Sequence, residues 1–309
     1  MMAEVVGLLR RILPLFAIIG LGSACAGLRV FPNVPLAVAT LNRFALYIGF
    51  PCLIVAGLAS DALVLPDAPA FYALHVAGSV VMISVAFFAS RSVARGPVAL
   101  GTLFGNIAYL GIPLAASALG AAAAGLASLS AAIHIALAMT FGPVLLIRWG
   151  TEATPNWSRI GGKVIRQPLV WAPFVGLAVR WLPDSVADPI LGLCQPMAAA
   201  AGPIALFMVG LYLWHHRNML RVAGRDALLI SGLKLLVYPV VAAVLVGAVG
   251  YNLSPLERSV LILQAGMPVA ITTFSLAEEY GVGQRAIAAA IVVSTLGALV
   301  TLPVILLLL

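Results

Sequence analysis

Apolar stretches long enough to cross a lipid bilayer follow one another along almost the whole chain. A transmembrane helix needs about 20 consecutive apolar residues, and ten such stretches are separated only by short polar or proline-containing joints. The predicted spans are 5–28, 36–60, 69–91, 98–120, 126–149, 165–182, 190–214, 226–250, 256–281 and 286–308. Because backbone in lipid must satisfy its own hydrogen bonds, the sequence predicts an all-α polytopic membrane protein with ten transmembrane helices.

Composition and charge agree with a chain that lies mostly in a membrane. Hydrophobic residues make up 63% and charged residues 9%, with a mean hydropathy of +1.13, far from the values of soluble domains. The net charge of +7 does not indicate nucleic acid, because the basic residues gather in the joints. If the N-terminus lies outside, 12 of the 17 Lys and Arg residues fall on inside joints. The positive-inside rule therefore predicts both termini outside (periplasmic) in a plasma or bacterial inner membrane.

A five-residue pattern occurs twice, each time within an apolar span. Gly111-Ile112-Pro113-Leu114-Ala115 and Gly266-Met267-Pro268-Val269-Ala270 share glycine, proline and alanine at the same spacing. Proline removes a backbone N–H group and clashes with the preceding turn, while glycine adds conformational freedom, so each pattern predicts a broken helix. Broken helices in matching positions of two halves are typical of the substrate site of secondary transporters.

The two patterns divide the chain into matching halves. Five spans in each half mean that the second half enters the membrane from the opposite side, which predicts a 5 + 5 inverted repeat. The fourth and ninth spans, which are the broken ones, are then expected to cross near the midplane. The expected organisation is a first repeat at 1–150, a cytosolic linker at 151–163 and a second repeat at 164–309.

The expected crossing is a candidate site for an anion. Half-helices that begin at Pro113 and Pro268 would direct unpaired N–H groups and the positive ends of their dipoles toward each other. Such ends bind anions without a fixed positive side chain, so we expect a small carboxylate as substrate. The residues expected there are Gly111, Ile112, Pro113, Gln264, Met267, Pro268 and Val269. The three cysteines have no metal-ligand spacing, and neither a cofactor nor a metal is expected.

Other polar residues within the spans are candidates for binding substrate or a coupling ion. His134 lies near the middle of its span, and Ser294, followed by Thr295, has the matching position in the last span. A buried neutral histidine bonded to a neighbouring helix is the alternative to a proton carrier. Lys234 lies about eight residues inside its span, where it could snorkel to the cytosolic face, form a structural pair or act on the substrate. No clustered acids mark a strong sodium or proton site at the crossing.

The broken segments and their surroundings resemble the auxin efflux carrier family. The resemblance covers all ten spans, and its motifs are Asn106-Ile107-Ala108-Tyr109-Leu110-Gly111-Ile112-Pro113-Leu114, Met267-Pro268-Val269-Ala270, Leu276-Ala277-Glu278-Glu279-Tyr280-Gly281 and Pro303. This family includes bacterial organic-acid permeases and plant auxin exporters and belongs with the bile-acid sodium symporters. The resemblance implies an elevator-type transporter in which the first, second, sixth and seventh spans are the scaffold and the other six move.

The resemblance also implies individual site residues. Asn106 matches an asparagine that contacts the carboxylate in the plant exporters. Gln167-Pro168 stands where those proteins have an Asn-Pro pair, so Gln167 keeps an amide but lengthens its reach. Gly105 stands where they have a proline. These departures leave the identity of the substrate open.

The sequence therefore predicts a secondary transporter of a small organic anion, and not an enzyme. A membrane potential contributes about 2.3 kcal/mol per charge per 100 mV, which drives an uncoupled monoanion outward, so export is expected. A sodium- or proton-coupled importer is the alternative, and a membrane-embedded lipid-modifying enzyme is a more distant one. The enzyme lacks support because the chain has neither clustered acids nor a His/Cys metal set. The sequence leaves open whether the apolar scaffold faces pair in a homodimer or meet lipid.

Overall fold

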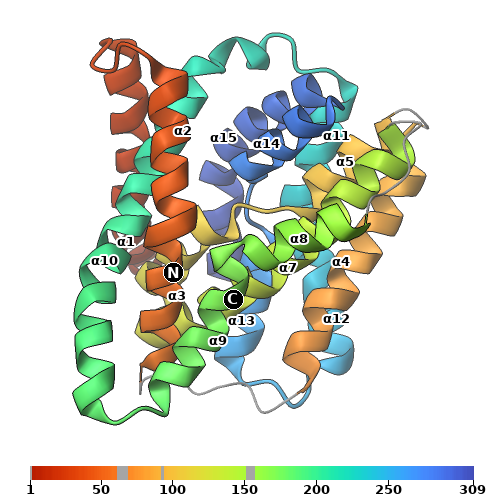
Figure 1. Cartoon of the computed structure of the whole chain (residues 1–309). Coiled ribbons are helices and arrows are strands. Elements are labelled where there is room, and N and C mark those ends of the chain that lie inside the picture. Colours follow the sequence, from red (N-terminus) through yellow and green to blue (C-terminus); the bar gives the residue numbers. More distant parts are fainter. Residues whose placement is uncertain (1, 61–68, 92–93, 151–156) are drawn as a thin grey trace. The chain divides into compact units, whose positions relative to one another are not determined.

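The secondary structure is helical throughout the part of the chain that the computed structural model describes, residues 2–60, 69–91, 94–150 and 157–309 (Figure 1). Within these residues, the one pairing of strand type is an isolated antiparallel bridge between Gly105 and Val269. The all-α class is thus confirmed.

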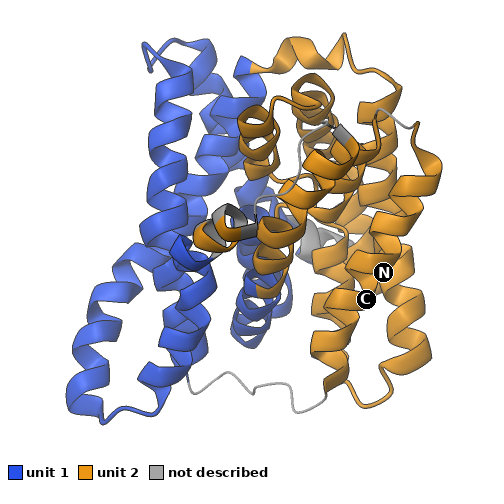
Figure 2. Ribbon diagram, turned by 45° about the vertical axis from the view of Figure 1, so that its right-hand side comes forward, with its two compact units in different colours: residues 1–65, 108–132, 165–215 blue, residues 66–107, 133–164, 216–309 orange. Residues whose placement is uncertain are grey.

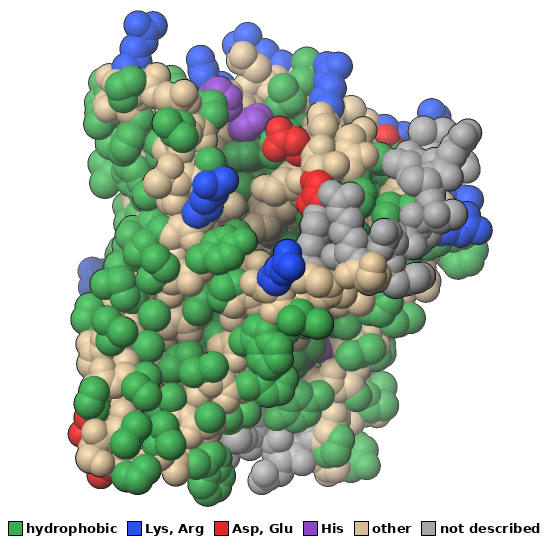
Figure 3. All heavy atoms as spheres, viewed as in Figure 1, with side chains coloured by type: hydrophobic (Ala, Val, Ile, Leu, Met, Phe, Trp, Pro, Cys, Tyr) green, Lys and Arg blue, Asp and Glu red, His purple; other side chains and the backbone are tan. Residues whose placement is uncertain are grey.

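Seven helical segments among the described residues are long and apolar enough to cross a membrane. They are Arg10–Gly27, Val34–Ala59, Pro69–Ala89, Ala121–Trp149, Asp184–His215, Arg225–Val249 and Gln284–Leu308. Two shorter apolar helical segments cover Ile107–Leu119 and Pro168–Arg180. Ten membrane crossings and the inverted 5 + 5 repeat stay predictions. Hydrophobic side chains cover much of the face seen in Figure 3, as expected for helices that meet lipid.

The chain divides into two compact units, coloured separately in Figure 2. Unit 1 consists of residues 1–65, 108–132 and 165–215, and unit 2 of residues 66–107, 133–164 and 216–309. Unit 1 thus holds the first, second, sixth and seventh predicted spans together with the second half of the fourth and the start of the fifth. The assignment of a scaffold, a moving part and two sequence repeats stays a prediction.

Unit 1 is built around a long helix that packs against the N-terminal one. Its elements are α1 (Met2–Gly27), α2 (Val34–Phe44), the π-turn η1 (Ala45–Gly49), α3 (Phe50–Ala59), α6 (Ile112–Leu119), α9 (Pro168–Arg180) and α10 (Asp184–His215), with the start of α7 (Ala121–Gly150). Figure 1 shows α1 and α10 side by side. A Cβ atom on Gly22 or Gly210 would collide with a carbonyl oxygen of the other helix. Small residues thus let the two backbones touch, and Ser23 Oγ donates to the Gly210 carbonyl at 2.9 Å.

Unit 2 contains two points at which a helix is interrupted, at residues 104–106 and 266–270. Its elements are α4 (Pro69–Ala89), α5 (Arg95–Leu103), the rest of α7, most of α8 (Trp157–Arg166), the short η4 (Arg217–Leu220), α11 (Arg225–Gly232), the π-turn η5 (Leu233–Val237), α12 (Tyr238–Val249), α13 (Pro255–Ala265), α14 (Ile271–Tyr280) and α15 (Gln284–Leu308). The start of α13 is fixed by a capping box, in which Ser254 and Glu257 bind each other's backbone N–H groups.

The predicted linker at 151–163 is partly helical. Residues 151–156 lie outside the described residues, but Trp157 begins α8, which continues to Arg166. Arg159, Lys163 and Arg166 alternate there with apolar residues at helical spacing, so the short polar stretch can form a helix rather than an extended connection.

Candidate functional site

The second predicted break is confirmed at the predicted residues. Helix α13 ends at Ala265, Gly266 to Ala270 are not helical, and α14 begins at Ile271. Pro268 has no N–H group to continue the helical hydrogen bonds. The next N–H group, that of Val269, donates instead to Ser294 Oγ of α15 at 3.0 Å. Ser294 therefore satisfies backbone that the break would otherwise leave unpaired.

The first break does not lie where the sequence predicted it. Phe104, Gly105 and Asn106 interrupt the helix, whereas Gly111, Ile112 and Pro113 belong to a helical run made of the π-turn η3 (Ile107–Gly111) and α6. Pro113 is the second residue of α6 and directly follows the π-turn η3, where the regular α-helical hydrogen-bond pattern is already interrupted. In unit 1, this proline packs against α10, and a Cβ on Gly202 would lie 3.0 Å from Pro113 Cγ.

The two breaks pair with each other inside unit 2. The Asn106 N–H donates to the Pro268 carbonyl at 2.6 Å, and the Ala270 N–H donates to the Phe104 carbonyl at 2.9 Å. These bonds flank the bridge between Gly105 and Val269. Each break thus supplies hydrogen-bond partners to the other, which lowers the cost of non-helical backbone in an apolar surrounding. We call this paired segment, residues 104–106 and 266–270, the crossing.

A lysine lies directly beside the crossing. Lys234, in the π-turn η5, has no exposed surface, and its Nζ donates to the carbonyl of Ala265, the last residue of α13, at 3.1 Å. A Cβ on Gly105 would lie 2.8 Å from Lys234 Cε and Nζ, so the lysine occupies the space that a side chain would need. The ammonium also faces the negative end of the α13 dipole. The Lys234 side chain therefore does not extend to an exposed surface, whereas a structural role and a role in binding substrate stay predictions.

Buried polar side chains without partners flank both breaks. Gln264, fully buried in the last turn of α13, has no hydrogen-bond partner for either amide atom among the described residues. The hydroxyl groups of Thr102, Thr273 and Thr295 are likewise buried and unpaired within the described residues. Thr102 lies two residues before Phe104, and Thr273 lies in the first turn of α14. Unpaired buried polar groups are costly, and such a concentration is typical of a ligand site.

The remaining predicted site residues are divided between the two units, with Gln167 in unit 1 and the others in unit 2. The Asn106 side chain is nearly buried, at 3% exposure, in unit 2. Gln167 is a half-buried residue at the start of α9 in unit 1, where its side chain makes no capping hydrogen bond. His134 Nε2 lies 3.1 Å from the Tyr238 hydroxyl in unit 2. Met267 and Val269 have no exposed surface.

Two threonines beside the breaks were not among the predicted site residues. Thr102 precedes the first break, and Thr273 follows the second. A polar residue next to a break in an apolar span is a readable signal, so both could have been found once the breaks were placed correctly.

The π-turn after the first break holds an aromatic contact in unit 1. The Tyr109 hydroxyl donates to Asn42 Oδ1 at 2.5 Å, and its ring stacks on Phe50 at a centroid distance of 4.9 Å. The chain passes from unit 2 to unit 1 after Ile107, just before these contacts. Asn42 and Phe50 thus fix the segment that leads away from the crossing.

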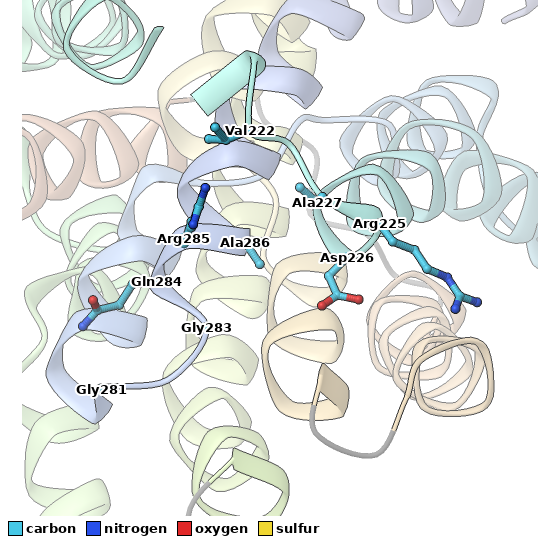
Figure 4. A pocket seen from close by; sticks show the side chains of 10 residues that line it. Val222, Arg225, Asp226, Ala227, Gly281, Gly283, Gln284, Arg285 and Ala286 are labelled. Carbon is cyan, nitrogen blue, oxygen red and sulfur yellow. The ribbon is translucent and has the colours of Figure 1, made fainter. Parts of the chain in front are cut away.

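An open pocket of about 570 Å³ lies elsewhere in unit 2, between the starts of α11 and α15 (Figure 4). Arg225, Asp226 and Arg285 contribute its charged groups. Figure 4 shows the side chains of Arg225 and Asp226 pointing apart. Because its charges do not converge on one point and its residues are at helix ends, this pocket lacks the concentrated polar groups of the crossing.

Comparison with known proteins identifies the family to which the chain belongs. The family described as "Membrane transport protein" matches residues 8–306. A protein of Rhizobium meliloti (strain 1021) named "Putative malonate transporter" is 29% identical over 307 residues, which cover 96% of this chain and 92% of that protein. An "Uncharacterized transporter" of Methanothermobacter thermautotrophicus is 35% identical over 150 residues, 47% of each protein.

A plant protein also matches part of the chain. "Probable auxin efflux carrier component 5a" of Oryza sativa subsp. japonica is 28% identical over 148 residues, 47% of this chain and 39% of that protein. The predicted resemblance is thus confirmed, and the lipid-modifying enzyme loses its support. The chain therefore belongs to the membrane transport protein family, together with auxin efflux carriers, and it is an integral membrane transporter rather than an enzyme.

Proposed function

We propose that this transporter carries small carboxylates, with dicarboxylates such as malonate as the first class to test. The observation that carries this proposal is the concentration of unpaired buried polar groups around the crossing. Gln264 and Thr273 offer donors on the two sides of the second break, and Lys234 adds a cation. Carboxylates are acceptors that take charge-assisted hydrogen bonds from such groups. Malonate is chosen as the first dicarboxylate because the relative named as a putative malonate transporter matches nearly the full chain.

Backbone at the crossing supports the same substrate class. The first turn of α14 begins at Ile271, directly after the second break, so the N–H groups of Ile271 and Thr272 have no preceding helical turn to bind, whereas the Thr273 N–H donates to the Ala270 carbonyl at 3.1 Å. The positive end of the α14 dipole favours a negative ligand beside Thr273. Lys234 uses one donor for the Ala265 carbonyl, and an ammonium group has three. We include Asn106 among the substrate-binding residues, because it is part of the crossing. Its backbone N–H donates to the Pro268 carbonyl, and its side chain is nearly buried.

We further propose an elevator mechanism in which unit 2 carries the crossing and the substrate. The support is that both breaks, Lys234 and the unpaired polar groups all belong to this compact unit. A carboxylate that moves alone would be driven outward by an interior-negative potential, at about 2.3 kcal/mol per charge per 100 mV. Import requires a cation to enter with the substrate.

The test is exchange of labelled malonate in proteoliposomes, with a panel of mono- and dicarboxylates as competitors. We expect the rate of malonate exchange by the Gln264→Leu protein to fall at least 10-fold, since a hydrogen bond to a charged group contributes about 1.5–3 kcal/mol. Gln284→Leu is the matched control, because Gln284 is exposed at the start of α15. A thermal-shift screen of the purified protein against the same acids reports binding without transport.

Two outcomes would contradict the proposal. Wild-type protein that neither exchanges nor is stabilised by any acid of the panel would remove carboxylates as the substrate class. Exchange by Gln264→Leu at the rate of Gln284→Leu would remove the crossing as the binding site. Asn106→Ala provides a second arm and is expected to abolish exchange while leaving membrane insertion intact. Asn218→Ala, at an exposed residue of η4, is its matched control.

A further inference from the structure

Two histidines from different helices meet in the interior of unit 2. His75 of α4 and His134 of α7 are each 3% exposed, and their rings are edge to face with centroids 5.1 Å apart. His134 Nε2 lies 3.1 Å from the hydroxyl of Tyr238, and that hydroxyl lies 3.4 Å from Ser79 Oγ. Ser79 Oγ in turn donates to the His75 carbonyl at 2.7 Å. These four side chains form one buried polar cluster, which the proposed substrate site does not use.

A small cavity adjoins this cluster. Its volume is about 20 Å³, and His75, His134 and Tyr238 line it together with apolar residues. This volume corresponds to about one water molecule, and a buried water needs two to four polar partners. His75 Nε2 has no hydrogen-bond partner within the described residues, although it is buried. A neutral imidazole with its proton on Nδ1 carries a lone pair on this nitrogen, so the position can accept a proton.

Tyr238 and Lys234 connect the cluster to the crossing. The Lys234 ammonium lies 4.2 Å from the centroid of the Tyr238 ring, whose hydroxyl reaches His134. The same ammonium holds the Ala265 carbonyl at the end of α13. Ala265 also lines the cavity beside the histidines. A charge on the imidazole pair is therefore separated from the crossing by a single layer of side chains.

We propose that His75 and His134 form a proton-binding site whose proton moves together with the substrate. This inference rests on the proposed function of carboxylate transport. A proton from water adds to a ring nitrogen on one side of the membrane and returns to water on the other, with no other bond changed. One proton per pair is expected, because two adjacent imidazolium ions in a water-poor interior would repel each other strongly.

Electrostatics gives the direction of the coupling. A proton on the pair adds positive charge on the far side of Tyr238 from Lys234, and this arrangement is unfavourable while the crossing holds no anion. A carboxylate at the crossing offsets both charges, so each ligand increases the affinity of the site for the other. Loading both partners together also reduces the net charge that crosses the membrane. The pair thus supplies the cation that import of a carboxylate requires.

The charged groups on the neighbouring elements α5 and α13 have partners of their own, so the charge beside the crossing depends on the histidines and Lys234. Arg95 of α5 lies over the Phe87 ring at 4.1 Å. On α13, Glu257 binds the Ser254 N–H, and Arg258 binds the carbonyl groups of Leu253 and Tyr251. The described residues that line the cavity include no carboxylate. The proton is therefore held by an imidazole that carries the positive charge itself.

The test compares malonate exchange with malonate uptake driven by a pH gradient, using proteoliposomes that contain a pH-sensitive dye. We expect wild-type uptake to accelerate under an inward proton gradient and to acidify the lumen. His75→Gln and His134→Gln should lose at least 10-fold of this gradient-driven uptake while keeping exchange within about threefold. His215→Gln, at the exposed end of α10, is the matched control and should behave as wild type. Tyr238→Phe keeps the ring under Lys234 and is expected to weaken the pH dependence.

A second measurement does not depend on transport. The chain has four histidines, so the His215→Gln/His216→Gln protein retains only the imidazoles of His75 and His134. We expect the ¹⁵N NMR signals of these rings to show one protonation as the pH is lowered. Malonate uptake that does not respond to the pH gradient would overturn the inference. Gradient-driven uptake that survives in His75→Gln/His134→Gln, or rings that do not titrate, would overturn it as well. Absence of carboxylate exchange together with ring titration would instead overturn the proposed function and leave the proton site supported.

Discussion

The backbone N–H of Asn106 donates to the carbonyl oxygen of Pro268 at 2.6 Å, although 162 positions separate the two residues in the chain. This bond joins two helices at the points where both are interrupted. Proline offers no N–H group of its own, yet its carbonyl is free to accept. The pairing explains how non-helical backbone persists within an apolar unit, since its polar groups find partners in the other break.

Gly105→Ala is expected to destabilise unit 2. The new Cβ would lie 2.8 Å from Lys234 Cε and Nζ, so the lysine must move and weaken its bond to Ala265. Overpacking of this kind costs about 1–3 kcal/mol. The measurement is the unfolding temperature of the purified protein in detergent. Gly232→Ala is the control, since no atom lies within 4 Å of its added Cβ, and it should not lower that temperature. Equal behaviour of the two variants would contradict the contact.

Ser294→Ala removes the partner of the Val269 N–H. A buried N–H group left without an acceptor costs about 1–3 kcal/mol, so both stability and transport should fall. Ser294→Thr keeps a hydroxyl group and should retain more of both. Thermal unfolding and malonate exchange are the measurements. Ser84→Ala, at an exposed serine that bonds within its own helix α4, is the matched control. A loss in Ser84→Ala as large as in Ser294→Ala would remove the role of the Ser294 hydroxyl.

Lys234→Met separates the charge of this side chain from its volume. Removing a buried charge relieves its desolvation cost, so the protein should remain folded or gain stability. If the ammonium binds the carboxylate, the affinity for malonate should fall at least 10-fold, as expected for loss of about 1.5–3 kcal/mol. Binding is measured as the malonate concentration that gives half of the maximal thermal shift. Unchanged affinity in a folded Lys234→Met protein would exclude contact between the lysine and the substrate.

Gly210→Ala is expected to separate α1 from α10 in unit 1. Its Cβ would collide with the Ile19 carbonyl oxygen, which cannot move without bending α1. The loss should reach about 1–3 kcal/mol or more. The readout is the amount of monodisperse protein recovered after heating. Gly192→Ala on the same helix has no atom within 4 Å of the added Cβ and should match wild type. Normal recovery of Gly210→Ala would show that the helices can part without loss.

The sequence located one break correctly and the other about two turns too late. Gly266 and Pro268 lie within the second break, where proline cannot continue the helix. Pro113 misled because a proline also fits the first turn of a helix, and the actual break at Gly105 has no proline to mark it. The need for glycine at position 105 arises from Lys234, which is 129 positions away in the chain. Such a contact cannot be read from local propensity.

The candidate site could be predicted in outline rather than in detail. Gln264 stands out as a polar residue one helical turn before Pro268 in an otherwise apolar stretch, and Asn106 is marked by its motif. Thr273 follows the second break and could have been found in the same way, whereas Thr102 could not, because the first break was predicted about two turns too late.

The histidine pair shows a second limit of reading along the chain. His134 can be singled out by its place in the middle of an apolar span, but His75 has no such mark, because it lies near the end of its own span. Pairs of this kind become visible only once α4 and α7 are packed together.

The isolated bridge between Gly105 and Val269 has a consequence for how such a protein can change. Inserting or deleting one residue in either of the two paired segments would shift their register by one residue. The backbone groups that now bond across the bridge would then face away, and both interruptions would lose their partners at once. The two segments thus depend on each other. A change in the length of one segment would keep the paired backbone only if the other segment changed in length as well.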